Sequence, residues 1–271
     1  MKLIKYFLFL ISLTIAAASV QAKVSDEFPV RKLYPAVPFI ELSDLHKERT
    51  RVIIVDVRSS YEFETLRIKG ALNISVSSPD FVANMKKLRA DNPKEKIVVY
   101  CNGKTCKKSY KAAQKCRDND IKNVVAYDAG IMDWAKKYPN DSVLLGRSPI
   151  DPNRIIAKST FKKKLIDTEK FEEMIGRKDV IVLDVRDSFQ REALSLFPGI
   201  DRRAFLDDTK EIQKVVQRAI REKKTLLIYD AAGKQVRWLM YSIESLGLKD
   251  YWFMKGGSNA YYAALRKQFL K

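Results

Sequence analysis

The reactive side chains of this sequence are concentrated in one short segment. All three cysteines, Cys101, Cys106 and Cys116, fall within it. An odd number of cysteines in large domains disfavours a disulfide scaffold. His46 is the only histidine, which disfavours a zinc centre built from several histidines and a hydrolase built on a Cys–His or Ser–His pair. What remains is thiol chemistry, in which a thiolate acts as nucleophile or forms a disulfide.

Cys101 stands where a ligand site is expected. It ends a predicted strand and directly precedes a predicted helix, and open parallel sheets place ligand sites at the carboxyl ends of their strands. Unpaired N–H groups at a helix start stabilise an anion, so we expect the pKa of Cys101 to fall below the value of about 8.5 of a free thiol. Lys104, Lys107 and Lys108 add positive charge that attracts anionic substrates.

The elements that must position this cysteine occur twice. Three segments recur in the same order at offsets of 127 to 129 residues, which indicates duplication of a whole domain. The matching pairs are VIIVDVR (52–58) with VIVLDVR (180–186), the strand ending at Cys101 with the strand ending at Asp230, and the segment around Gly130 with the segment around Gly257.

Each repeat alternates strands with helices. Short runs of branched apolar residues predict strands that are buried on both faces, and apolar residues at helical spacing predict the helices between them. This alternation implies right-handed crossovers and an α/β fold, in which an open, mainly parallel sheet carries helices on both faces. In the first repeat we expect strands at 52–57, 97–100 and 124–127 and helices at 80–88 and 107–117.

The amino terminus resembles a cleavable secretory signal at residues 1–22. Lys2 and Lys5 precede an apolar run from Tyr6 to Ala18, and small residues end at Ala22. The alternative is a membrane anchor, but the run is shorter than the roughly 20 residues of a spanning helix. We therefore expect export to the periplasm or another extracytoplasmic compartment, with no membrane insertion after cleavage.

The mature chain is basic and long enough for two domains. The net charge of +18 becomes +16 without Lys2 and Lys5. Such a surplus favours anionic partners, although nucleic acid is disfavoured because an exported protein seldom meets it and no basic-aromatic module is present. The turn-rich, polar stretch 139–164 predicts a linker between domains at 33–138 and 165–271.

Three motifs of the first repeat resemble the rhodanese-like family. They are the segment 56–71, the cysteine segment YCNGKTCKKSYKAA and the closing segment YDAGIMDW, and the second repeat carries counterparts of all three. Within the segment 56–71, the residues that match the family pattern are Asp56, Arg58, Glu62, Phe63, Ile68, Gly70 and Ala71. The resemblance covers nearly all of the chain after its first dozen mature residues, apart from the linker.

The resemblance implies a sulfurtransferase without metal or organic cofactor. Cys101 would take the outer sulfur of a small anionic donor such as thiosulfate as a persulfide and pass it to a thiol, to cyanide or to a protein acceptor. The second repeat, with Asp230 at the cysteine position, is expected to be catalytically silent. The expected substrate-binding residues are Asn102, Gly103, Lys104, Thr105, Cys106, Lys107 and Lys108 of the loop, with Asp56 and Arg58 bordering the pocket.

Two alternatives remain beside this hypothesis. Related cell-cycle phosphatases need an arginine where Lys107 stands, and lysine lacks the planar fork that grips phosphate oxygens, so a phosphatase is disfavoured. The other alternative is a non-catalytic binding or thiol-redox module, in which Cys101 and Cys106 form a reversible disulfide. Cys116 is expected to pack in the core.

Overall fold

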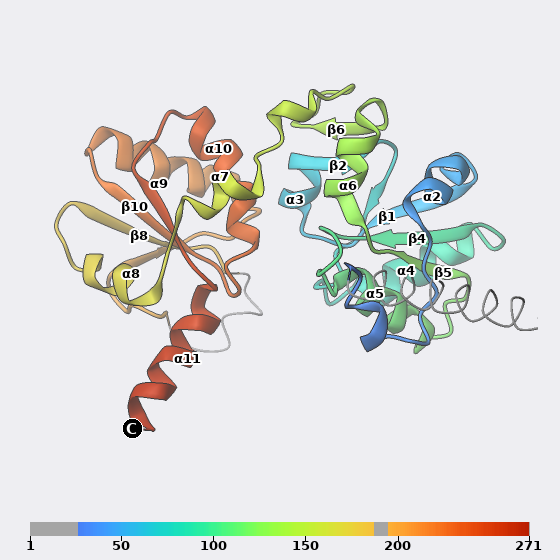
Figure 1. The fold of residues 1–271 in the computed structure, drawn as a ribbon, viewed down its shortest axis with the longest axis horizontal. Coiled ribbons are helices and arrows are strands. Elements are labelled where there is room, and N and C mark those ends of the chain that lie inside the picture. The colour runs from blue at the N-terminus through green and yellow to red at the C-terminus, as the bar shows by residue number, and fades with distance from the viewer. Residues whose placement is uncertain (1–26, 187–194, 271) are drawn as a thin grey trace, which may run out of the picture. The chain divides into compact units, whose positions relative to one another are not determined.

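The computed structural model describes residues 27–186 and 195–270 and divides into two units, residues 1–150 and 151–271 (Figure 1). Both units are α/β with a parallel sheet, as predicted. The predicted leader, residues 1–22, lies outside the described residues. Within the described part of the chain, no helix combines the length and apolar character needed to cross a membrane.

The sheet of unit one is built around two apolar strands, β1 (Val52–Asp56) and β4 (Lys96–Tyr100). Its order is β3-β1-β4-β5, with every neighbouring pair parallel. In Figure 1, α4 and α5 lie below these strands and α2 and α6 lie above them. Cover on both faces explains why the strands are continuous apolar runs instead of alternating with polar residues.

The strands and helices of unit one agree with the sequence prediction to within a few residues at each end. The remaining elements are η1 (Arg31–Leu33), α2 (Leu42–Glu48), α3 (Ser60–Thr65), β2 (Leu66–Ile68), β3 (Leu72–Asn73), α4 (Phe81–Asp91), α5 (Lys108–Arg117), β5 (Val124–Tyr127), α6 (Gly130–Lys137), η2 (Pro139–Asp141) and β6 (Ser142–Leu144), which pairs with β2.

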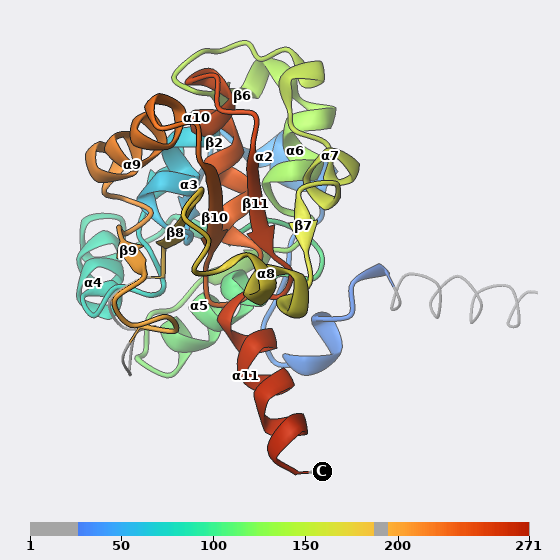
Figure 2. The same ribbon diagram turned by 90° about the vertical axis from the view of Figure 1, so that its left-hand side faces the viewer.

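Unit two repeats this sheet. Its strands follow the order β7-β11-β10-β8-β9, all parallel, and lie side by side in Figure 2. The order β9-β8-β10-β11 in unit two corresponds to the order β3-β1-β4-β5 in unit one. The outer strand β7 pairs with β11, and in unit one Phe39 forms a parallel bridge with Ala126 of β5. The shared strand order confirms the duplication.

The elements of unit two follow one another as in unit one. They are η3 (Pro152–Arg154), α7 (Lys158–Lys162), β7 (Leu165–Ile166), α8 (Thr168–Met174), β8 (Val180–Asp184), β9 (Asp201–Arg203), α9 (Thr209–Arg221), β10 (Thr225–Tyr229), η5 (Gln235–Trp238), α10 (Leu239–Ser245), β11 (Tyr251–Met254) and α11 (Gly257–Phe269).

The stretch 139–164, for which we predicted a linker, contains regular structure on both sides of the division between the units. That division falls between Ile150 and Asp151. On its first side, β6 pairs with β2, which belongs to unit one. On its second side, Phe161 of α7 packs its ring against Phe253 of β11, which belongs to unit two.

One close backbone contact joins α6 to the loop after β4. Gly130, the first residue of α6, has a φ of +71°, and a Cβ built on it would lie 2.4 Å from the backbone nitrogen of Gly103. Next to it, the N–H of Ile131 donates to the carbonyl of Cys101 at 3.0 Å. Only glycine fits both the backbone conformation and the space. Gly257, which begins α11, makes the equivalent contact with the loop of unit two.

We predict that Gly130→Ala destabilises unit one more than Gly146→Ala does. Both glycines have positive φ, but no atom lies within 4 Å of a Cβ built on Gly146. Gly146→Ala should therefore cost only the backbone strain of about 1–2 kcal/mol. Gly130→Ala should cost about 1–3 kcal/mol more because it also overpacks the loop. Urea unfolding of the two variants measures the difference, and equal losses would show that the contact is unimportant.

Candidate active site

Cys101 lies directly after β4 and is fully buried. Its sulfur is 3.4 Å from the carbonyl oxygen of Cys106 and 3.5 Å from Oγ of Ser109. The loop 102–107 then leads into α5 and turns back on itself, with the N–H of Cys106 donating to the carbonyl of Gly103 at 2.7 Å. This turn brings the second cysteine beside the first.

Cys106 is the more exposed of the two sulfur side chains, and its pKa is lowered. The hydrogen bond from the Cys101 thiol is the largest cause that lowers the pKa of Cys106. Burial opposes this effect, but backbone N–H groups of Lys108 and Asn102 and the charge of Lys108 add to it, so that the pKa falls to about 6. A thiol with this pKa is mostly ionised at neutral pH.

The expectation that Cys101 holds the low-pKa thiolate is therefore wrong for the resting site. Burial, followed by the adjacent Cys106, raises the pKa of Cys101. None of the three cysteines forms a disulfide in the structure. The two neighbouring cysteines thus differ in the direction of their pKa shifts, upward for Cys101 and downward for Cys106.

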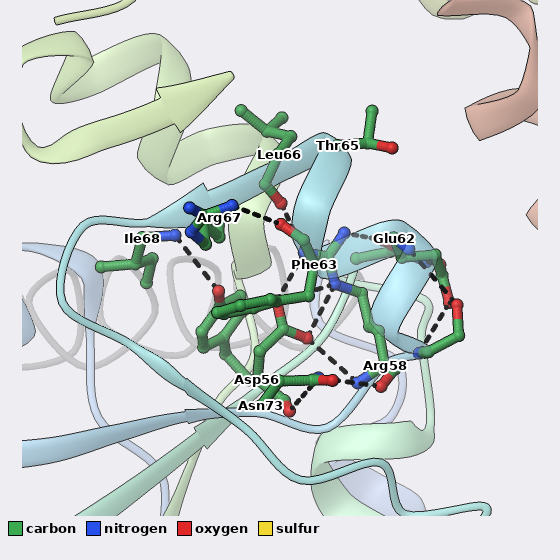
Figure 3. Close-up of polar contacts among 12 residues, drawn as sticks. Asp56, Arg58, Glu62, Phe63, Thr65, Leu66, Arg67, Ile68 and Asn73 are labelled. Carbon is green, nitrogen blue, oxygen red and sulfur yellow. Dashed lines mark hydrogen bonds and ion pairs between the residues drawn. The ribbon is translucent and has the colours of Figure 1, made fainter. Parts of the chain in front are cut away.

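Buried polar side chains hold the start of the loop in place. The amide of Asn102 donates to Oε1 of Glu62 at 2.7 Å and accepts from Nη1 of Arg58 at 3.0 Å. Figure 3 shows Arg58 between the Asp56 carboxylate and the backbone at Leu66. Asp56 and Arg58 have no exposed surface, and Arg58 reaches the loop through Asn102. These two buried residues support the loop from the interior of unit one.

Glu62 links the loop to α5. Burial would raise the pKa of this fully enclosed carboxyl, but Lys108, Arg58 and hydrogen bonds from Asn102 and Ser59 lower it to about 2. Nζ of Lys108 lies 3.3 Å from Oε2 of Glu62. The pair keeps a positive charge close to Cys106 without leaving the Glu62 carboxylate unpaired.

The other predicted loop residues play different parts. Lys104 is bound by two carboxylates, Glu27 at 2.5 Å and Asp133 at 3.1 Å, and is held there as a structural ion pair. Thr105 and Lys107 are exposed. The loop thus gathers Cys101, Asn102, Cys106 and Lys108 around one point.

In unit two, the loop after β10 surrounds a carboxylate of the chain itself, that of Asp230. Asp230 follows β10 and is almost fully buried. Burial raises its pKa, and backbone hydrogen bonds counter that effect. Because both carboxylate oxygens accept from N–H donors, the loop encloses a built-in anion. The donors are the backbone N–H groups of Ala232, Gly233, Lys234, Gln235 and Val236.

Sequence reasoning missed two residues of the site. Glu62 was taken as part of a motif, yet it anchors both Asn102 and Lys108. Its spacing from Ser59 is that of a capping box, which the structure contains, and that signal could have placed it at a helix start. Ser109, a neighbour of the Cys101 sulfur, carries no comparable signal. Among the described residues, no cluster of histidine, cysteine, aspartate and glutamate is arranged to hold a metal ion.

We predict that Cys106 reacts with iodoacetamide at a rate that is half-maximal near pH 6. The lowered pKa makes the thiolate the main form above about 6 and depletes it below that value. Cys116 serves as the internal control, because burial raises its pKa to about 12 and leaves it a thiol. Peptide mass spectrometry after timed labelling separates the two sites. Lys108→Met should move the midpoint upward, and a wild-type midpoint above about 8, as for a free thiol, would contradict the assignment.

The comparisons with known proteins identify the family. A family model described as the rhodanese-like domain matches residues 40–137 and again residues 167–264. A tRNA uridine(34) hydroxylase from Bdellovibrio bacteriovorus is 33% identical over 103 residues, which are 37% of this chain and 28% of that protein. The chain therefore spans well under half the length of this curated relative.

Solved structures with a related fold include two sulfurtransferases. The thiosulfate sulfurtransferase from Pseudomonas aeruginosa is 19% identical with a TM-score of 0.37, over 87% of this chain and 46% of that one. The human single-domain sulfurtransferase is 25% identical with a TM-score of 0.31, over 38% of this chain and 98% of that one. The two family matches lie one in each structural unit, and the chain belongs to the rhodanese-like family as a tandem of two such domains.

Proposed function

We propose that unit one is a sulfurtransferase that takes the sulfane sulfur of a small anionic donor such as thiosulfate as a persulfide of Cys101. The acceptor is a thiol or cyanide, and a protein thiol is one form it could take. The second unit, with Asp230 in place of the cysteine, is silent in this reaction. The chemistry needs no metal or organic cofactor, because the thiolate is itself the nucleophile.

One observation carries this proposal, namely the anion enclosed by the loop of unit two. Five backbone N–H groups converge on the Asp230 carboxylate. Cys101 holds the same place after the equivalent strand of unit one. A persulfide anion on Cys101 would occupy the corresponding position in the loop of unit one, stabilised by the same kind of N–H donor.

The first step requires movement of the loop and of one proton. Because Cys101 has no exposed surface, the donor has to displace part of the loop 102–107 to reach the sulfur. The Cys101 proton passes to the adjacent Cys106 thiolate, with which Cys101 already shares a hydrogen bond. Cys101 is then the thiolate that attacks the outer sulfur of the donor, and sulfite leaves when the donor is thiosulfate.

A thiol-redox module is the second candidate, and the position of Cys106, whose carbonyl oxygen lies 3.4 Å from the Cys101 sulfur, favours it. In that case thiosulfate leaves no sulfur on the protein, and oxidation gives a Cys101–Cys106 crosslink. Mass spectrometry separates the two candidates. An adduct of about 32 Da on Cys101 is a persulfide, whereas a loss of about 2 Da without any earlier adduct and without sulfide release is a simple disulfide.

We predict that Cys101→Ser reduces thiosulfate-dependent sulfur transfer to below about 1% of wild type, because a serine hydroxyl cannot carry persulfide sulfur. Asp230→Ala should leave the rate within about twofold. It should also destabilise unit two by about 1–3 kcal/mol, since five backbone N–H groups, two of them in buried hydrogen bonds, lose their acceptor. Turnover and urea unfolding test both variants. Unchanged turnover in Cys101→Ser would overturn the proposed function.

We also propose that the protein is exported and begins near Lys23 once mature. The support is the charged, apolar and small-residue pattern of residues 1–22. Amino-terminal sequencing of the protein from the extracytoplasmic fraction should give a start at or close to Lys23. Recovery of Met1 on membrane-bound protein would contradict both the cleavage site and the compartment.

A further inference from the structure

Cys106 is a second reactive sulfur. In simple sulfur transfer through Cys101, it would accept the first proton and then have no further role. The loop folds so that the Cys101 sulfur lies 3.4 Å from the Cys106 carbonyl oxygen. The tight turn from Gly103 to Cys106 holds the second cysteine in this position, and each cysteine shifts the pKa of the other. Nearness of the reacting groups is the condition for fast attack within one molecule. A persulfide formed on Cys101 would therefore form next to a competent nucleophile.

The surroundings of Cys106 favour its thiolate form, which is the form that acts as a nucleophile. Backbone N–H groups of Asn102 and Lys108 face its sulfur, and the Lys108 ammonium, fixed by Glu62 at 3.3 Å, lies nearby. Glu62 is the carboxylate paired with this cation, and Cys101 is the other titratable neighbour. Lys108 interacts with both sulfurs, more strongly with that of Cys106, while Cys101 lies beside a carbonyl oxygen and the hydroxyl and N–H of Ser109.

We propose that Cys106 is the resolving thiol of unit one, which attacks the Cys101 persulfide, forms a Cys101–Cys106 disulfide and expels sulfide. This inference rests on the proposed function, since it needs the persulfide as its starting point. The second substrate is then a thiol reductant that reopens the disulfide, and not cyanide. Cys116 takes no part, because it lies outside the loop 102–107, near the C-terminal end of α5.

The cycle balances in atoms and electrons. Cys101 thiolate attacks the outer sulfur of thiosulfate, the sulfur–sulfur bond of thiosulfate breaks and sulfite leaves with its electron pair. The proton held by Cys106 returns to the outer sulfur of the persulfide. The Cys106 thiolate then attacks the inner sulfur, a new sulfur–sulfur bond forms and hydrosulfide leaves. Two external thiols reduce the resulting disulfide and are oxidised to their own disulfide.

The test uses the reduced full-length protein, freed of reductant and mixed with thiosulfate under anaerobic conditions. Wild type should release about one equivalent of sulfide per chain, stop, and show a loss of about 2 Da at the Cys101–Cys106 pair. Adding a dithiol should restart the release. Cys106→Ser should release at least about tenfold less sulfide and keep an adduct of about 32 Da on Cys101. Cys116→Ala is the matched control and should behave like wild type.

Three other results have distinct meanings. If Cys106→Ser acquires no sulfur while its melting temperature is that of wild type, the persulfide itself is absent and the proposed function fails. If both proteins hold a stable persulfide and release no sulfide, sulfur transfer stands and the resolving role of Cys106 is overturned. If Cys106→Ser does not fold, the wild-type experiment decides alone. Sulfide release with formation of the Cys101–Cys106 disulfide supports the proposal, and a lasting persulfide contradicts it.

Discussion

The loop at the end of the central strand depends on acceptors for its backbone N–H groups, five of which in unit two donate to the single carboxylate of Asp230. A buried N–H without a partner costs about 1–3 kcal/mol. A glycine at the start of the helix that follows the neighbouring strand packs against the loop, namely Gly130 of α6 in unit one and Gly257 of α11 in unit two. In unit two the chain itself supplies the acceptor at this point, the side chain of Asp230.

The two units share the residues that support the loop and differ in the side chain that the loop surrounds, a cysteine in unit one and Asp230 in unit two. In both, an arginine two residues after a strand-ending aspartate returns to that carboxylate through the same three nitrogens. Arg58 pairs with Asp56, and Arg186 pairs with Asp184. The equal geometry shows that this pair supports the sheet edge independently of the chemistry. In unit one the pair extends to the loop through Asn102.

Much of the fold was predictable because it depends on local patterns. Runs of branched apolar residues predicted β1, β4 and β5, and the repeated spacing predicted two domains of one kind. These signals depend on burial on both faces of a parallel sheet, which leaves a direct mark on residue type. The place of Cys101 at the strand end followed from the same pattern.

The charge distribution of the site was not predictable, because it depends on contacts between distant or tightly turned segments. The pKa is lowered at Cys106 and raised at Cys101 because the turn of the loop, not its sequence spacing, decides the surroundings of each sulfur. Lys104 was expected at the mouth of the site, yet Glu27 and Asp133 bind it. Both partners lie far from Lys104 in the sequence, and no local pattern indicates them.

The carboxylate of Asp230 has a consequence for how many donor molecules one chain can hold. Its oxygens already accept from the backbone N–H groups of the second loop, so these donors are taken by the chain itself. Under the proposed function, only the loop of unit one would receive a donor molecule. One two-domain chain would then bind one donor, as a single domain would.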